Sequence, residues 1–436
     1  MVRKGLVLFA MMIVFPFTVR SQDEVGELKQ QIQIQQQQIS GLNDEVQQLR
    51  SRQRLGEKST AKKFQEIESK KQQGDPDYEN WFELIQFFGD LRYRHEYTDG
   101  TGNMGDSSRT WDTSNRHRIR ARLGAKAKVS DEVDVILQIA TGSDGISNDA
   151  DQTLDDSFSQ KDLWLDQAFV TYTPSWWTDG TVLAGKMSNP FYRVGSNQCI
   201  WDEDINPEGV ALSYSTALTP TIRLNANAGG FWIKERWNGF DSGMFGLQSS
   251  LHHDLPGDMG LTFGASYYDF THIQGLGDVG DAWGNTKSGG TFVHDFDILE
   301  VFTEWSTSVP VQKNKKMPLS VYGLYIQNIG IESGRTLEQR DMGYCVGLTA
   351  NEAKKPGSWQ ASYDYRYMEE NAVLGQLSDS DFIGGGTGGK GHRFQYKFQV
   401  KKNIQAAGTF YVCKYDPYGL KKTLNRFQID LEMFFR

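Results

Sequence analysis

Six basic side chains recur on one face of the segment RHRIRARLGAKAKV, which covers residues 116–129. In an extended strand, alternate residues point to the same side. Arg116, Arg118, Arg120, Arg122, Lys126 and Lys128 therefore share one face, and small or apolar residues occupy the other. The segment before it adds Arg92 and Arg94 beside Asp90 and Glu96. Such a row of cations must face water, and its mutual repulsion requires carboxylates or solvent nearby.

Acidic side chains that could compensate the charge of this row lie in the connection at residues 189–206, which contains Asp202, Glu203 and Asp204 in succession. Two later strands carry further charges on their polar faces. Asp364 and Arg366 belong to the first of these strands, and Arg393 and Lys397 belong to the second. All these residues are candidates for a charged, water-facing lining.

Other motifs predict little chemistry. The segment GGGTGGKG at 384–391 has Gly391 where a phosphate-binding loop needs Ser or Thr, and a strand follows where a helix should. Asp149, Asp151 and Asp155 do not have the spacing of a calcium loop. His252 and His253 are adjacent and point in opposite directions on a strand. No nucleophile, base and acid arrangement stands out, so neither catalysis nor a cofactor or metal is expected.

Along most of the chain, polar and apolar residues alternate with a period of two, and this alternation places the charges on one face of each strand. From about residue 87 we count sixteen candidate strands, most of them about the 9–11 residues that a tilted strand needs to cross a bilayer. They lie near 87–97, 116–129, 132–141, 162–173, 180–188, 208–215, 220–232, 243–253, 259–270, 295–308, 318–328, 341–350, 358–368, 392–401, 404–414 and 425–435.

The connections between these strands alternate in length. Short ones such as SDE, DLPGD and KKN alternate with long ones rich in Gly, Asp, Ser and Asn, such as 142–161 and 369–391. A soluble sandwich gives no reason for this alternation, whereas an up-and-down outer-membrane barrel does. We therefore predict a 16-stranded antiparallel transmembrane β-barrel.

Apolar faces are expected to contact lipid. Charges keep to one side of most strands, and aromatic residues gather at strand ends, including Trp176 and Trp177 in a short turn, as an interfacial girdle requires. A cation facing lipid would cost about 2–4 kcal/mol near the bilayer midplane, so the basic row is assigned to the lumen. The segments DLWLDQAF and SVYGLYIQ do not assign cleanly to two faces.

Composition agrees with this class of protein. Aromatic residues make up 12% of the chain and glycines number 45, which favours strands and turns. The net charge of -9 argues against a nucleic-acid partner. Three widely spaced cysteines, Cys199, Cys345 and Cys413, form neither a disulfide framework nor a metal cluster, and we interpret them as free or partly paired thiols.

The N-terminal region has a different organisation. Residues 1–21 have the basic start, apolar run and cleavage-site pattern of a signal peptide. Residues 22–56 are predicted to form a periplasmic coiled coil, because apolar residues keep heptad spacing from Val25 to Leu49. A polar linker at 57–86 would join this stalk to a barrel at 87–436. The stalk predicts oligomerisation without fixing the number of chains.

The segments FGDLRYRHEY, RHRIRARLGAKAKV, LDQAFVTYTP, LAGKMSNPF and WDEDINPEGVALSY resemble the putative porin family of Gram-negative outer membranes. The resemblance implies a homotrimeric diffusion porin whose third loop folds inward and narrows the channel. Carried over, it sets Arg118, Arg120 and Arg122 against Asp202, Glu203 and Asp204 across a constriction. Chains of this kind usually end on an aromatic residue, whereas here Arg436 follows Phe435.

The expected function is passive diffusion of small hydrophilic solutes and ions, with outer-membrane lipid and further copies of the chain as partners. The alternative is a structural protein that tethers the membrane to the cell wall through its stalk. An outer-membrane enzyme and a soluble β protein are weaker rivals. The last strand, with Phe427, Ile429, Leu431, Met433 and Phe435 alternating with polar residues, should close the barrel against 87–97.

Overall fold

The computed structural model describes residues 84–100, 113–142, 148–312, 315–331, 340–415 and 422–435. The predicted signal peptide and coiled coil lie outside the described residues, as do Arg436 and nearly all of the predicted linker. Within the described ranges, no helix has the length and apolarity to cross a membrane.

Sixteen strands form one antiparallel sheet, as the alternating sequence predicts. They are β1 (Ile85–Gly100), β2 (Ser114–Lys128), β3 (Val133–Thr141), β5 (Leu163–Tyr172), β6 (Gly180–Lys186), β7 (Glu208–Thr219), β8 (Ile222–Lys234), β9 (Ser242–Leu255), β10 (Met259–Thr271), β13 (Phe296–Gln312), β14 (Lys315–Asn328), β15 (Met342–Ala350), β16 (Trp359–Met368), β17 (Gly389–Lys401), β18 (Ile404–Tyr415) and β19 (Lys422–Phe435). Three two-residue strands lie in loops: β4 (Gln152–Thr153), which pairs with β2, and β11 (Lys287–Ser288), which pairs with β12 (Thr291–Phe292).

The last strand closes the sheet on the first, so neither of these two terminal strands has a free edge. β19 pairs antiparallel with β1, in a register that sets Arg92 opposite Glu432 and Arg94 opposite Asp430. This closure confirms the prediction made from the C-terminal alternation. Closure also pairs the backbone groups that hydrocarbon could not solvate. β1 begins at Ile85, two residues before the expected start.

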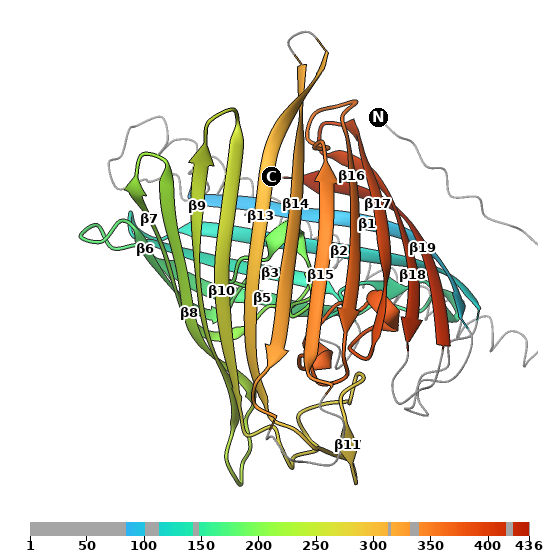
Figure 1. Cartoon of the computed structure of the whole chain (residues 1–436). Coiled ribbons are helices and arrows are strands. Elements are labelled where there is room, and N and C mark those ends of the chain that lie inside the picture. The colour runs from blue at the N-terminus through green and yellow to red at the C-terminus, as the bar shows by residue number, and fades with distance from the viewer. Residues whose placement is uncertain are drawn as a thin grey trace, which may run out of the picture. The chain divides into compact units, whose positions relative to one another are not determined.

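Short turns and long loops segregate to opposite ends of the barrel (Figure 1). Turns such as 256–258 and 402–403 lie at the end drawn at the top, and loops such as 369–388 lie at the other end. The two ends are called the turn end and the loop end below. The alternation of connection length along the sequence is therefore a consequence of the up-and-down topology.

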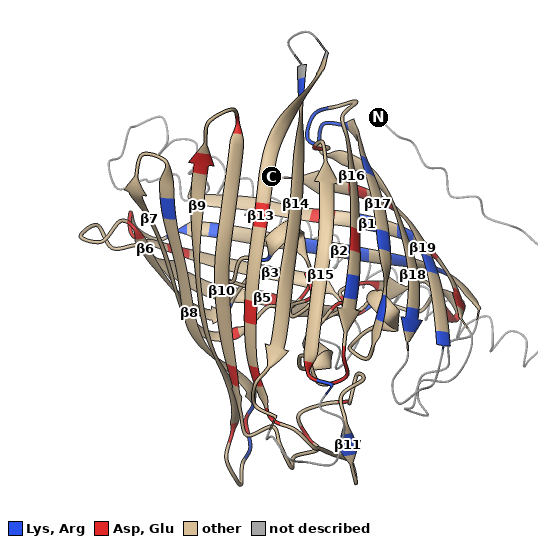
Figure 2. Ribbon diagram, viewed as in Figure 1, with Lys and Arg blue, Asp and Glu red and all other residues tan. Residues whose placement is uncertain are grey.

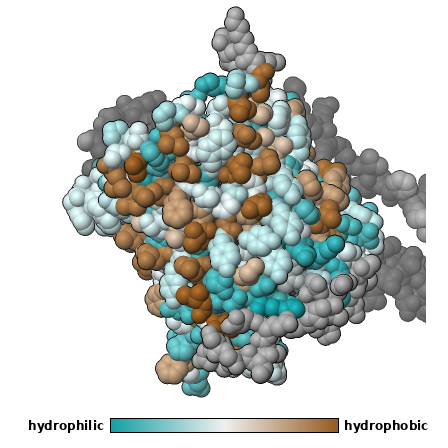
Figure 3. All heavy atoms as spheres, in the orientation of Figure 1, coloured by the Kyte–Doolittle hydropathy of each residue, from teal (hydrophilic) through white to brown (hydrophobic). Residues whose placement is uncertain are grey.

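The outer face of the barrel is apolar. On β19, Phe427, Ile429, Leu431, Met433 and Phe435 are exposed, while Gln428 and Asp430 between them are buried inside. β17 repeats the pattern, with its aromatic residues outside and Arg393 inside. Figure 3 shows hydrophobic side chains spread over the outer face of the strands in view.

The inside of the barrel has two chemically different halves. Lys and Arg residues concentrate on β1, β2 and β16–β19, whereas β7–β10 are largely uncharged (Figure 2). On the side formed by β10 and β13–β15, the inward side chains are mostly apolar, and they include Phe296, Ile298, Phe302, Leu324 and Ile326. This apolar interior explains why SVYGLYIQ on β14 does not alternate: its inward face packs against protein instead of water.

Candidate functional site

The segment between β6 and β7, residues 187–207, folds into the barrel, and we name it the crossing loop. It contains the short 3-10 helix η2 (Val194–Ser196), which packs against β13, β14 and β15. The Tyr192 hydroxyl donates to Glu304 on β13 at 2.7 Å, and the Tyr192 amide donates to Gln248 on β9 at 2.6 Å. Phe191 stacks on Trp201 in the apolar half, and both rings meet Tyr268 edge to face.

A second inward segment, residues 369–388, lies against the crossing loop, and we name it the plug loop. The Asp202 amide donates to the Leu377 carbonyl at 2.8 Å, and the Asp379 amide donates to the Gln198 carbonyl at 3.0 Å. Apolar plug-loop residues, including Val373 and Ile383, are buried. The two loops therefore form one packed unit that narrows the lumen against the basic strands.

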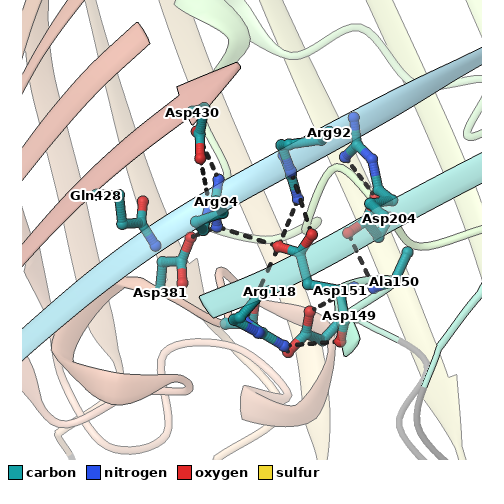
Figure 4. A network of polar contacts seen from close by, with 12 residues as sticks. Arg92, Arg94, Arg118, Asp149, Ala150, Asp151, Asp204, Asp381, Gln428 and Asp430 are labelled. Atoms are coloured by element: carbon teal, nitrogen blue, oxygen red, sulfur yellow. Dashed lines mark hydrogen bonds and ion pairs between the residues drawn. The ribbon is translucent and has the colours of Figure 1, made fainter. Parts of the chain in front are cut away.

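Arg92 and Arg94 on β1 form the centre of a charged network at this narrowing (Figure 4). Arg92 lies 2.6 Å from a carboxylate oxygen of Asp151 and 3.4 Å from one of Glu203. Arg94 lies 2.7 Å from Asp430, and 3.2 Å from both Asp151 and Asp381. Charge-assisted contacts from three loops thus converge on a single strand.

The next row of arginines, on β2, meets the crossing loop in part. Arg120 lies 3.4 Å from both Glu203 and Asp204, and Arg122 lies 3.6 Å from Asp204. Arg118 does not meet the crossing loop in this way; it pairs with Asp149 at 2.5 Å.

Asp202 also differs from the expected arrangement. Its carboxylate accepts hydrogen bonds from the amides of Asp204, at 2.9 Å, and Ser380, at 2.8 Å, and so joins the crossing loop to the plug loop. The contact across the narrowing is therefore made by Arg120 and Arg122 with Glu203 and Asp204.

The remaining predicted residues occupy distinct places. Arg116 pairs with buried Glu96 at 2.5 Å near the loop end, and Lys126 pairs with Asp134 at 2.8 Å near the turn end. Lys397 on β17 lines an internal cavity of about 470 Å³ together with Arg92, Arg120 and Glu203.

Asp364, Arg366 and Arg393 form a second buried cluster. The two oxygens of Asp364 accept from Arg366 and Arg393, each at 2.6 Å, and Arg366 also donates to Asp379 of the plug loop at 2.5 Å. This cluster anchors the plug loop to the barrel wall, so its structural role is at least as direct as any role in lining the lumen.

Neighbouring internal cavities share lining residues. The 470 Å³ cavity at the turn end and a 380 Å³ cavity beside the crossing loop share Ser196 and Glu203. The second cavity shares Ile205 and Asn206 with a 740 Å³ cavity toward the loop end. Glu203, whose side chain is 48% exposed, borders both of the first two cavities. The series follows the space between the basic strands and the crossing loop.

Four carboxylates of this site were not among the residues predicted from sequence to line it. Asp149 and Asp151 come from the loop after β3, and Asp379 and Asp381 come from the plug loop. An excess of arginines on one strand face signals that partners exist, but it does not say which loop supplies them. Among the described residues, no three His, Cys, Asp or Glu side chains are placed to hold a metal ion.

Burial and charge act in opposite directions on the loop carboxylates. Burial alone would raise the pKa of Asp151, but Arg92, Arg94 and Arg118 outweigh it and lower the pKa to about 2. For Asp202, burial and the carboxylates of Asp204 and Asp379 raise the pKa well above its ordinary value. Burial also raises the pKa of Asp149.

These shifts predict the pH dependence of stability. Above pH ~4, Asp151 should contribute about 2 kcal/mol to the free energy of unfolding, because its pKa is lower in the folded chain than in the unfolded one. This contribution is lost as the pH falls toward 2. Asp202 and Asp149, with raised pKa values, should add stability as the pH falls from neutral toward 4. We therefore expect the unfolding temperature to be highest in mildly acidic solution.

Thermal unfolding of the detergent-solubilised protein between pH 3 and pH 8 measures this dependence. The variant Asp151→Asn should lose part of the decline below pH 4. Glu203 and Asp381, whose pKa values neighbouring arginines lower against the effect of burial, contribute to the remainder. An unchanged acid limb in Asp151→Asn would contradict the assignment of that limb to Asp151.

Comparison with known proteins adds a family and a fold. A family model described as Putative porin matches residues 103–318 and 292–435, which together exceed half of the chain. A structure of OprB from Pseudomonas putida is similar over 83% of this chain and 97% of that chain, with 14% identity and a TM-score of 0.53. At this identity the likeness is one of fold.

Two further structures align less closely. OmpF from Salmonella typhi gives a TM-score of 0.47, with 12% identity over 80% of this chain and 97% of that chain. DcaP, an outer membrane channel of Acinetobacter baumannii, gives 0.44, with 15% identity over the same shares. A search of curated proteins finds no match.

Proposed function

Because the chain belongs to the Putative porin family, whose model matches it between residues 103 and 435, we propose that it forms a passive diffusion pore in a bacterial outer membrane. Small hydrophilic solutes and ions would cross between the basic strands and the crossing loop. The observation that carries this proposal is the series of adjacent cavities lined by charged side chains inside a closed barrel with an apolar outer face.

The lining supports a transverse field at the narrowing. Cations of β1, β2 and β17 occupy one side, including Arg92, Arg120 and Lys397, and carboxylates of the crossing loop occupy the other, including Glu203 and Asp204. Opposed charges of this kind orient dipolar solutes and admit ions of both signs past compensated walls. We assign Arg92, Arg94, Arg120, Arg122, Glu203, Asp204 and Lys397 to this lining.

Self-association, proposed here as a homotrimer, is supported by a gap in the barrel wall. β6 pairs with β5 only at residues 168–172 of β5. β7 pairs with β8 only at residues 222–231 of β8, which leaves the end of β8 nearest the loop end of the barrel without this partner. Among the strands of the described residues, none therefore lies between residues 163–167 of β5 and residues 232–234 of β8. The 740 Å³ cavity opens here and is lined by Asp166, Lys186 and Glu208. Polar groups at such an opening need protein cover in a membrane.

Ion selectivity of single channels tests the pore. Neutralising Lys397 with glutamine should shift reversal potentials toward cation preference, because it removes a positive charge from the lining without breaking a close ion pair. A unit charge about 4 Å from a permeating ion in water is worth about 1 kcal/mol, or about fivefold in ion ratio. Glu203→Gln should shift the preference toward anions.

The matched control is Lys128→Gln, because Lys128 lies at the end of β2 and pairs with the turn residue Asp131. It should leave selectivity unchanged. Absence of discrete conductance steps in a planar lipid bilayer would overturn the proposal that the protein forms a pore. Conductance with identical selectivity in Lys397→Gln and Glu203→Gln would overturn the assigned lining.

A further inference from the structure

Two of the three cysteines meet inside the barrel, although 145 residues separate them in the sequence. Cys199 belongs to the crossing loop and is 2% exposed, and Cys345 belongs to β15 and is fully buried. Both belong to one buried cluster, and the segment that carries Cys199 packs against β15, so the Cys345 thiol is near enough to raise the pKa of Cys199. This arrangement meets the first requirement of a disulfide, which is that the two cysteines are neighbours in the fold.

The surrounding packing fixes this approach. The helix η2, which directly precedes Cys199 in the chain, packs against β14 and β15. The Tyr322 ring lies in a slot between Gly195 of the crossing loop and Gly347 of β15, close to where a Cβ atom of either glycine would stand. The buried guanidinium of Arg366 is near enough to both sulfur atoms to interact electrostatically with each.

The third cysteine provides an internal comparison. Cys413 lies on β18 in a separate buried cluster with Phe382, Ile383 and Tyr411. Its neighbours are the backbone of Gly391 and of the plug loop, and neither of the other two thiols belongs to this cluster. Any oxidation that follows proximity should therefore involve Cys199 and Cys345 and leave Cys413 as a thiol.

We propose that Cys199 and Cys345 form a disulfide that ties the crossing loop to the barrel wall. The oxidant is a protein or small-molecule disulfide. The thiolate of one cysteine attacks this disulfide, which gives a mixed disulfide and releases one thiol of the oxidant. The second cysteine, as its thiolate, then displaces the other half. The chain gains one S–S bond and loses two protons and two electrons, and the oxidant leaves as two thiols.

The bond should form while the barrel is still folding. In the finished fold the Cys345 thiol and burial both raise the pKa of Cys199, so the reactive thiolate is scarce and oxidants cannot reach it. The oxidising environment outside the inner membrane follows from the proposed outer-membrane location, and the inference rests on that location for its cellular setting. The proximity of the two thiols does not depend on it.

Counting thiols in the purified full-length protein tests the bond. The chain is prepared without reductant, denatured and treated with N-ethylmaleimide before intact-mass measurement. Wild type should take up one label, at Cys413, and three after reduction. Cys345→Ser should take up two labels without reduction, and Cys413→Ser none. A peptide linking residues 199 and 345 should appear in the non-reduced digest.

Refolding in detergent with oxidised glutathione separates the bond from the proposed location. One label after this refolding supports the pairing, even if the protein forms no channel. Three labels in both the cell-derived and the refolded wild type would overturn it. Where the pore conducts, Cys199→Ser should increase current noise above that of Cys413→Ser, and equal noise would overturn the anchoring role of the bond.

Discussion

Replacing Asp364 with alanine should lower the free energy of unfolding by about 3–5 kcal/mol, the cost of leaving buried charges without their partner. Asp364 on β16 is fully buried and bridges Arg366 and Arg393. Arg366 is also buried, so the variant leaves two guanidinium groups sharing the interior with one remaining carboxylate, Asp379. Because Asp379 belongs to the plug loop, that loop should loosen as well.

Urea unfolding of the protein in detergent, followed by tryptophan fluorescence, measures this loss. The isosteric variant Asp364→Asn keeps the shape and should fall between alanine and wild type. Asp131→Ala, which removes an exposed carboxylate from a short turn, should unfold like wild type. Equal midpoints for Asp364→Ala and Asp131→Ala would mean that the cluster does not hold the plug loop.

Most of the barrel could be predicted from sequence, because lipid and water impose a simple alternation on each strand. The sixteen strands and their closure follow from that pattern and from connection length. The faces of the segment DLWLDQAF could not be assigned from sequence, and the reason is local. The pairing of β3 with β5 shifts register between Gln138 and Ile139, which leaves Asp166 unpaired. A bulge of this kind moves later side chains to the other face, and no period of two survives it.

The interior was harder to predict because its chemistry depends on contacts between distant segments. The row of arginines from Arg116 to Arg122 predicts a polar interior. It does not predict that the partners of Arg118 come from the loop after β3. Tyr322, Leu324 and Ile326 point inward and yet are apolar, since they pack against the crossing loop. Alternation reports only whether a face meets water, and these side chains meet neither water nor lipid.

Replacing Gly195 with alanine should displace the crossing loop and raise the single-channel conductance. Gly195 has φ +59°, and an added Cβ would stand 2.2 Å from Cε1 of Tyr322. The ring has little room to move away, because Gly347 also packs closely against it: a Cβ there would stand 2.4 Å from its Cζ. The cost combines about 1–2 kcal/mol of left-handed backbone strain with about 1–3 kcal/mol of overpacking.

Gly289→Ala separates these two costs, because Gly289 has nearly the same backbone angle, φ +58°, but no atom within 4 Å of the added Cβ. It should show the strain alone, as a small shift in the urea midpoint with unchanged conductance. Gly195→Ala should show a larger shift in the urea midpoint together with higher and noisier currents, because the crossing loop can no longer pack against Tyr322. Adding Tyr322→Leu should restore part of both. Identical behaviour of the two glycine variants would mean that the Tyr322 contact does not hold the crossing loop in the pore.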